Sequence, residues 1–251
     1  MSPGGWLTFM HERHRFWQRA LRLLSLGVPR EASSALFGHD HSLQQETWLR
    51  SLQKEKQHII DWHDRLTDIP FVIIDMETTG FSPEQGDEIL AMAAAKTVGG
   101  VVTDAYMTLV KPEKPIPEHI SALTGIEAKD VVFAPPLAEA LRTFVPFIAA
   151  GVLIGYHIGH DLAFLRHALW RHYRQKWSGR FLDLQPMMTL IGHSCPTFDD
   201  ALACYGIRCP RRHTADGDVE AMTKLWAILL KELHGRGIDT LHDLYAALSR
   251  H

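Results

Sequence analysis

The feature that most restricts the fold of this 251-residue chain is an apolar run that ends in two acidic residues, FVIIDMETTG at 71–80. Four strongly apolar residues in a row are typical of a buried strand. Because side chains alternate across a strand, Asp75 and Glu77 share one face. Like charges at this spacing repel, and each carboxylate raises the pKa of the other. A cation between them relieves that repulsion, and a divalent metal ion is the first candidate.

From residue 70 onward, strand and helix patterns alternate. A hairpin is predicted at Gly99-Gly100, between strand patterns at 88–98 and 101–110. A proline-rich loop at 111–117 and a turn between short helices at 121–130 follow. Further short strands are predicted at 152–156 and 181–185, and helices at 136–150, 161–173, 199–205, 218–233 and 240–249. This order indicates an α/β domain with a mixed sheet.

Residues 1–66 differ from the rest, with tryptophan, histidine and basic residues at roughly helical spacing. They predict two helices, at 11–26 and 42–66, which form an N-terminal helical extension ahead of a domain at 67–251. The stretch QRALRL at 18–23 loosely resembles a sliding-clamp-binding peptide, but a plain amphipathic helix gives the same pattern.

Composition narrows the functional classes. The net charge is −3, whereas a protein that binds nucleic acid through a broad basic surface is more basic. An enzyme that grips a strand end through a metal site needs no such surface. Three cysteines without a CxxC pair argue against a disulfide framework and a structural zinc site, so we expect a reducing, cytoplasmic location. No apolar run reaches about 18 residues, so no membrane span is expected.

Two later acids lie where helices are predicted to begin. Asp161 follows GYHIGH, and Asp218 opens the last long helix. Each has an alternative interpretation as a helix cap, stabilised by the helix dipole. His213 lies five residues before Asp218, and Gly217 indicates a turn between them. The imidazole can then reach a site that Asp218 helps to form, although a solvated loop histidine is the alternative.

Taken together, these motifs resemble the DEDD exonuclease superfamily in its DEDDh (DnaQ-like) branch. The best-known members of this branch are the 3′–5′ proofreading subunits of bacterial replicative polymerases, such as the epsilon subunit of DNA polymerase III. The segments that carry the resemblance are DMETTG (75–80), SALTGIEAKDV (121–131), GYHIGHDLAFLRHAL (155–169), FLDLQ (181–185) and HTADGD (213–218).

The resemblance implies a ribonuclease H-like exonuclease fold, with a central mixed five-stranded sheet flanked by helices. Where this chain has Tyr156-His157 the family usually has His-Asn, and where it has His160 the family usually has Phe. Neither departure replaces an acidic residue. Thr214 stands where the tyrosine branch of the superfamily has its tyrosine, which favours the histidine branch.

The resemblance also implies the chemistry. Two Mg²⁺ or Mn²⁺ ions, about 3.5–4 Å apart, would assist phosphodiester hydrolysis. Carboxylate oxygens suit these ions better than zinc. His213 would be the general base that takes a proton from the attacking water. The implied metal ligands are Asp75, Glu77, Asp161 and Asp218.

Other residues are implied to hold the strand end. Thr78 would bind the last nucleotide, and Leu123 and Thr124 of the LTG segment would contact it, with Leu123 as a wedge against the terminal bases. Core packing is an equal alternative for Leu123. Arg211 and Arg212 precede His213 and could contact phosphates, or they could be solvated loop residues.

We therefore expect a metal-dependent 3′–5′ exonuclease that releases nucleoside 5′-monophosphates from a nucleic acid strand. Single-stranded DNA is favoured over RNA as the substrate, in a proofreading or repair-like role. The alternatives are an RNA-trimming exoribonuclease, and a non-catalytic binding module whose N-terminal helices dock on a polymerase or another protein. A hydrolase of small phosphodiesters is a third possibility.

Overall fold

The computed structural model describes residues 60–149 and 151–250. Its centre is a five-stranded sheet in the order β3-β2-β1-β4-β5. β1 pairs antiparallel with β2 and parallel with β4, while β2–β3 is antiparallel and β4–β5 parallel. The predicted mixed five-stranded sheet is therefore confirmed. The strands are β1 (Phe71–Thr78), β2 (Ile89–Val98), β3 (Val101–Leu109), β4 (Val152–Gly155) and β5 (Phe181–Asp183).

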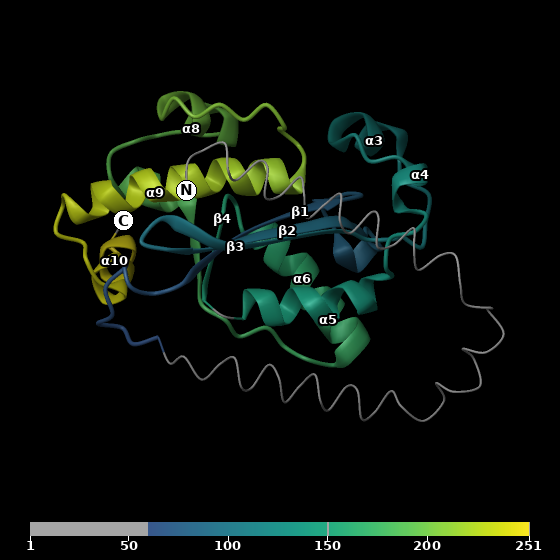
Figure 1. Ribbon diagram of the computed structural model, residues 1–251, viewed down its shortest axis with the longest axis horizontal. Coiled ribbons are helices and arrows are strands. Elements are labelled where there is room, and N and C mark those ends of the chain that lie inside the picture. The colour runs from purple at the N-terminus through teal and green to yellow at the C-terminus, as the bar shows by residue number, and fades with distance from the viewer. Residues whose placement is uncertain (1–59, 150, 251) are drawn as a thin grey trace. The chain divides into compact units, whose positions relative to one another are not determined.

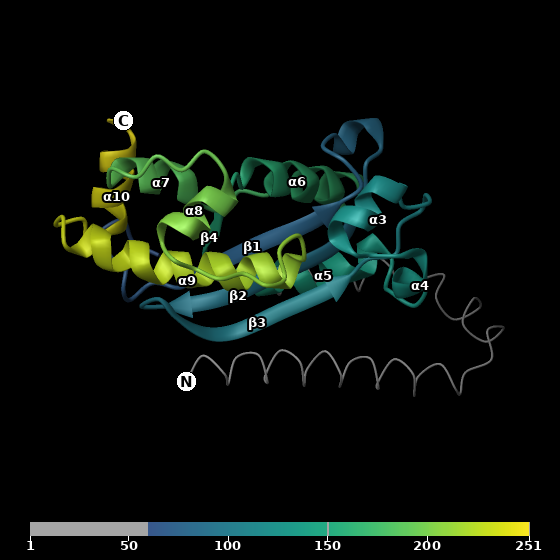
Figure 2. The same ribbon diagram turned by 90° about the horizontal axis from the view of Figure 1, so that it is seen from above.

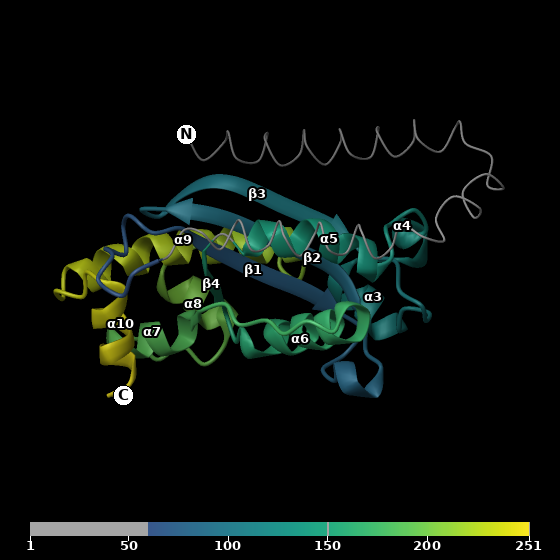
Figure 3. The same cartoon turned by 90° about the horizontal axis from the view of Figure 1, so that it is seen from below.

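Helices cover both faces of the sheet, with α9 on one face and α5 and α6 on the other (Figure 1). Seen from below, α5 and α6 lie in front of the strands (Figure 3). The helical elements are η1 (Pro83–Gln85), α3 (Glu118–Thr124), α4 (Ala128–Val131), α5 (Leu137–Ile148), α6 (Gly159–Tyr173), α7 (Leu184–Leu190), α8 (Phe198–Cys204), α9 (Ala215–His234) and α10 (Leu241–Leu248).

The predicted hairpin is confirmed at Gly99-Gly100. Both glycines have positive φ, 58° and 76°. A two-residue turn of this kind matches the twist of the strands it joins, and it favours glycine because φ is positive at both positions. The hairpin places β2 next to β1, which carries the first two acidic residues.

Core packing sets the position of α9 along β1. The fully buried ring of Trp226 packs edge-on against Phe71, with ring centroids 4.6 Å apart. From Trp226 back to Asp218 is eight residues of helix, about 12 Å, and from Phe71 to Asp75 is four residues of strand, about 13 Å. The similar lengths bring Asp218 alongside Asp75 when α9 runs antiparallel to β1.

Several predicted helix starts are wrong by a few residues. α9 begins at Ala215, with Thr214 as its N-cap, so Asp218 lies within the first turn and does not cap it. α8 begins at Phe198, one residue before its predicted start at 199, with Thr197 as its N-cap. Threonine and aspartate are both favoured N-cap residues, so the sequence pattern alone does not show which of them caps the helix. Likewise α6 begins at Gly159, two residues before Asp161.

Two further differences concern whole segments. β5 ends at Asp183, and residues 184–190 form α7, a helix that the sequence did not predict. Residues 61–66 form turns and a bridge to Thr240, where the sequence predicted the end of a helix at 42–66. In this segment Leu66 is buried and its N–H donates to the Asp239 carbonyl at 2.8 Å. The predicted helix at 11–26, the rest of that at 42–66 and the QRALRL segment lie outside the described residues.

The boundary predicted at residue 67 stays a prediction. Within the part of the chain that the structure describes, no helix is both long and apolar enough to cross a bilayer.

Candidate active site

Two strand residues and one helix residue bring three carboxylates together. Asp75 and Glu77 project from β1, and Asp218 projects from the first turn of α9. One oxygen from each of the three lies within 4.8 Å of the others. The residues opposite on β2 are small, since Asp75 pairs with Ala93 and Glu77 with Ala91. Because directly paired residues share a face, these alanines leave space beside the carboxylates.

Asp161 is the fourth predicted acid and lies next to this group. It is 4% exposed, in the first turn of α6. Its charge contributes to raising the pKa of Asp75, after the larger effect of burial. Burial raises the pKa of Asp161 itself, and hydrogen bonds from its own backbone and from that of Met76 oppose this effect. The backbone of β1 therefore helps to hold the Asp161 side chain at the edge of the cluster.

The positive charge near the cluster, as far as the structure describes it, does not balance the four carboxylates. Burial, followed by the charges of Asp161, Glu77 and Asp218, raises the pKa of Asp75 well above its ordinary value. Burial and then the charge of Asp218 raise the pKa of Glu77 to about 7. Burial is also the main reason that the pKa of Asp161 is raised to about 8. Carboxylates this hard to ionise gain stability from a bound cation.

These residues fit a divalent metal. The donors are all hard carboxylate oxygens, close together and half-buried to buried, which is the ligand set that Mg²⁺ and Mn²⁺ prefer. Asp216, the neighbouring acid, instead pairs with Arg211, as does Glu220. Asp75, Glu77 and Asp218 would hold the metal, with Asp161 at their side.

Among the residues that the structure describes, a single arginine contacts the cluster. Arg212 donates through Nη1 to Oδ2 of Asp218 and through Nε to Asp199, the latter at 2.6 Å. Its guanidinium carbon also lies 4.9 Å from the centre of the Phe198 ring. Nothing in the sequence distinguishes Arg212 from Arg211, because both directly precede His213. The fold separates them, since only Arg212 reaches a carboxylate of the cluster.

His213 occupies an unusual backbone position beside Asp218. Its φ is 58°, in the left-handed region that non-glycine residues rarely adopt. Its N–H donates to Oδ2 of Asp218 at 3.2 Å. The turn is tight because Gly217 lies against the Arg211 carbonyl, where a Cβ would come within 2.0 Å of the oxygen. The turn lies at residues 210–213, earlier than the one predicted at 213–217, because residues 215–217 already belong to α9. It holds His213 next to Asp218.

The three predicted substrate contacts differ in their surroundings. The Thr78 hydroxyl donates to the Gly80 carbonyl at 2.7 Å and lies 3.2 Å from Nε2 of His160. Leu123 is 53% exposed on α3, which lies beside the carboxyl end of β1 (Figure 2). Leu123 thus has the exposure that a wedge needs. Thr124 is 5% exposed, and its hydroxyl donates to the Ile120 carbonyl at 2.9 Å.

His157 and His160, which differ from the usual family residues, contact side chains close by. His157 has φ of 53°, and its Nε2 lies 3.0 Å from Oε1 of Gln185. The Asp183 carboxylate accepts the backbone N–H groups of His157, Ile158 and Gln185 at 3.0–3.2 Å. Asp183 therefore fixes the turn that leads into α6. Burial lowers the pKa of His160, whose ring contacts Phe81 and Phe164.

The fold and the carboxylate cluster together define a nuclease-type α/β domain. The model of an exonuclease family, RNase_T, matches residues 72–226, which include all four acids and His213. The chain belongs to this exonuclease family, and its resemblance to the DnaQ-like branch is confirmed.

Similar proteins carry related names. A *Rhodobacter capsulatus* DNA polymerase III subunit epsilon-like protein is 34% identical over 202 residues, covering 75% of this chain and 27% of that protein. The *Aquifex aeolicus* DNA polymerase III subunit epsilon is 36% identical over 112 residues, covering 45% and 55%. The *Bacillus subtilis* 3′-5′ exonuclease DinG is 28% identical over 186 residues, covering 72% and 20%. The chain thus spans between a fifth and about half the length of these relatives.

Solved structures confirm the ribonuclease H-like exonuclease fold. An *E. coli* exonuclease I complex with single-stranded DNA superposes with a TM-score of 0.59 at 20% identity, covering 70% of this chain and 42% of that one. Exonuclease X in complex with 5′ overhanging duplex DNA superposes with a TM-score of 0.50 at 18% identity, covering 66% of this chain and 93% of that one.

Proposed function

We propose that this chain is a divalent-metal-dependent 3′–5′ exonuclease that acts on DNA and releases nucleoside 5′-monophosphates. The observation that carries the proposal is the meeting of Asp75, Glu77 and Asp218, with oxygens within 4.8 Å, in a member of the exonuclease family. The names of the relatives, which include a 3′-5′ exonuclease and DNA polymerase III subunits, support the direction and the substrate.

Two Mg²⁺ or Mn²⁺ ions would be held by Asp75, Glu77, Asp218 and Asp161. When bound, they would neutralise charge on the phosphoryl oxygens and on the leaving oxygen. His213 would accept a proton from the attacking water. The new bond joins the water oxygen to phosphorus, and the bond from phosphorus to the 3′ oxygen of the preceding nucleotide breaks. The products are a 5′-monophosphate and a strand with a new 3′ hydroxyl.

The strand end would lie between the loop after β1 and α3. Thr78 would contact the terminal nucleotide, because its hydroxyl lies on the strand that carries Asp75 and Glu77. Leu123 would contact the terminal base with its exposed side chain. Thr124, whose hydroxyl bonds within α3, would support the position of Leu123.

Binding to a polymerase or another protein through residues 1–66 is part of the same proposal. It draws support from the relatives named as DNA polymerase III subunits. The free cysteines Cys195, Cys204 and Cys209 accord with the proposed cytoplasmic location.

The test is a gel assay with a 5′-labelled single strand, as DNA and as RNA, in Mn²⁺. We expect a ladder that shortens from the 3′ end, faster on DNA. Asp75→Ala should abolish it, while Asp68→Ala, which removes an exposed acid just before β1, should not. Faster shortening of the RNA strand would show that RNA, and not DNA, is the preferred substrate. No cleavage of either strand by the unaltered chain would overturn the proposal in favour of a binding module.

A further inference from the structure

The segment formed by α6 and the residues that follow it, up to Arg180, has a charge opposite to that of the whole chain. Between Gly159 and Arg180 there are five basic residues and a single acid, Asp161, which is buried in the carboxylate cluster. The complete chain has a net charge of −3. The five basic residues are Arg166, Arg171, Arg174, Lys176 and Arg180.

These residues continue from the candidate active site. At 100° per residue, the face that contains His160 also contains the exposed residues of the helix. His160 contacts Thr78 and Phe81, which follow the acidic residues of β1. The face therefore starts beside the carboxyl end of β1, and it runs to the last turn of α6. Its exposed members are Ala163, Arg166, Trp170, Arg171 and Arg174.

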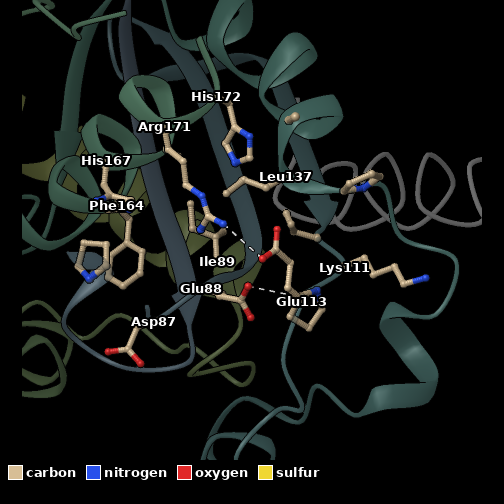
Figure 4. A pocket seen from close by; sticks show the side chains of 16 residues that line it. Asp87, Glu88, Ile89, Lys111, Glu113, Leu137, Phe164, His167, Arg171 and His172 are labelled. Atoms are coloured by element: carbon tan, nitrogen blue, oxygen red, sulfur yellow. Dashed lines mark hydrogen bonds and ion pairs between the residues drawn. The ribbon is translucent and has the colours of Figure 1, made fainter. Parts of the chain in front are cut away.

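One flank of this face is a pocket of mixed charge. His167, Arg171 and His172 line it from α6, opposite Glu88 and Glu113 (Figure 4). Arg171 pairs with Glu113 at 3.3 Å, between two exposed side chains. Because the acids offset the charge of Arg171, this flank is a poor match for a chain of phosphates.

The other flank differs, because among the described residues no acid pairs with its arginines. Within the described residues, no ion pair involves Arg166 or Arg174. Between them on the helix surface is Trp170, at four residues from each and 51% exposed. The guanidinium of Arg174 lies 5.5 Å from the centre of the Trp170 ring, and that of Arg166 lies 5.9 Å from the Phe181 ring. This row thus alternates cations with an exposed aromatic ring.

We propose that Arg166, Trp170 and Arg174 form a second contact surface for single-stranded nucleic acid. The surface would bind the part of the substrate strand that lies upstream of the 3′ end, so the inference rests on the proposed function. Guanidinium groups bind phosphates with several donors, and bases stack on aromatic rings whatever their sequence. A single strand is favoured over a duplex because only unpaired bases offer their faces to Trp170.

The length of the helix sets which strands reach this surface. From Asp161 to Arg174 is thirteen residues, about 20 Å along the axis. At roughly 3.4 Å per stacked nucleotide, this corresponds to at most about six nucleotides. A trinucleotide held at the carboxylate cluster should miss the surface, whereas a strand of twelve nucleotides should cover it.

The experiment measures binding by fluorescence anisotropy, with all variants in an Asp75→Ala background so that the strand is not consumed. We expect Arg166→Gln with Arg174→Gln to raise the Kd for a single-stranded DNA 12-mer about tenfold or more. The salt dependence of log K should become shallower by about 1.4, from the loss of two phosphate contacts. Trp170→Ala should raise the same Kd at least about fivefold.

The matched control is Lys224→Gln with Lys231→Gln, which removes two exposed charges seven residues apart on α9. It should leave the Kd unchanged, and no α6 variant should alter the Kd of a trinucleotide. Unchanged 12-mer binding, an equal loss for both lengths, or a loss confined to duplex DNA would overturn the inference.

A parallel gel assay of the chain with Asp75 intact separates this inference from the proposed function. If the chain hydrolyses the strand but 12-mer binding does not depend on Arg166 and Arg174, the proposed second surface alone would be overturned. No hydrolysis, with 12-mer binding that depends on both arginines, would support the surface and overturn the exonuclease.

Discussion

Arg212 and Asp218 form an ion pair at the edge of the carboxylate cluster, through Nη1 of the arginine and Oδ2 of the aspartate. The same carboxylate oxygen accepts the N–H of His213. Arg212 is in turn held by Asp199 at 2.6 Å. The pair therefore links three parts of the site: a proposed metal ligand, the turn that carries His213, and the start of α8. Burial raises the pKa of both Glu77 and Asp218, and the positive charge of Arg212 lowers it by a smaller amount.

Removing Arg212 should destabilise the metal-free protein and have less effect on the metal-bound one. Arg212→Gln leaves the largely buried Asp218 without its charged partner, which should lower the free energy of unfolding by about 1–3 kcal/mol in EDTA. Saturating Mn²⁺ should restore much of this loss, because the metal takes over the compensation of the Asp218 charge. Urea titrations with and without Mn²⁺ measure both quantities.

Arg211→Gln is the matched control for this experiment. It breaks ion pairs with Asp216 and Glu220, which lie outside the cluster. Its cost should therefore be the same with and without Mn²⁺. Equal metal dependence in the two variants would show that Arg212 has no special relation to the metal site.

Neutralising Asp75 should stabilise the metal-free fold while removing its response to metal. Asp75→Asn keeps the shape of the side chain and removes a carboxyl group whose pKa is raised by burial and then by the neighbouring acids. We expect a higher melting temperature than the parent protein in EDTA at pH 8. We also expect loss of the increase that Mn²⁺ gives the parent by binding only to the folded state. Asp68→Asn should change neither, and a metal-induced increase that survives in Asp75→Asn would count against the site.

The stability of the metal-free protein should fall as the pH rises from about 4 to 8. The pKa values of Glu77 and Asp161 in the folded protein, about 7 and about 8, lie above the values near 4 of unfolded chains. The folded state therefore keeps protons that the unfolded state releases, and this contribution is complete below pH 4 and lost above about pH 8. The slope should reach about 1.4 kcal/mol per pH unit for each proton.

Urea titrations in EDTA across this range give the slope directly. Saturating Mn²⁺ should flatten it, since ions replace the protons. Stability that rises with pH between 5 and 8 in EDTA would contradict the raised pKa values.

Replacing His213 should reduce catalysis by about 10²–10⁴, the usual contribution of a general acid or base. His213→Ala removes the imidazole but leaves the backbone N–H that bonds Asp218. His157→Ala is the control, because His157 is also a histidine with positive φ, 53° against 58°. Its ring bonds to Gln185, away from the carboxylates. The measurement is kcat on a 5′-labelled strand, and equal losses in both variants would point to a backbone effect.

Leu123→Ala should weaken the handling of the strand end at little cost in stability. Leu123 is 53% exposed, so its truncation should change the free energy of unfolding by less than about 0.5 kcal/mol. We expect lower kcat/KM on a DNA strand, measured by the same gel assay. Val132→Ala truncates a side chain of similar exposure, 50%, next to α4, and should leave kcat/KM unchanged. An unaffected Leu123→Ala variant would remove the wedge from the proposal.

Several features of this protein follow from local sequence patterns. Alternation along FVIIDMET placed Asp75 and Glu77 on one face, and paired glycines predicted the β2–β3 hairpin. Alternating strands and helices predicted the mixed sheet, and the motif order predicted the exonuclease family. These signals are strong because each arises from residues that are neighbours along the chain.

Which distant groups meet depends on how the helices and strands pack in three dimensions. The packing of Trp226 on Phe71 fixes α9 along β1 and so brings Asp218 to the strand acids. In the turn before α9, Arg212 pairs with Asp218 of the cluster, whereas Arg211 pairs with Asp216 and Glu220. The N-cap role of Thr197 and the helix after Asp183 were likewise hidden, because several nearby residues had equal propensity. Such choices depend on side-chain contacts between elements far apart in the sequence, which local periodicity does not encode.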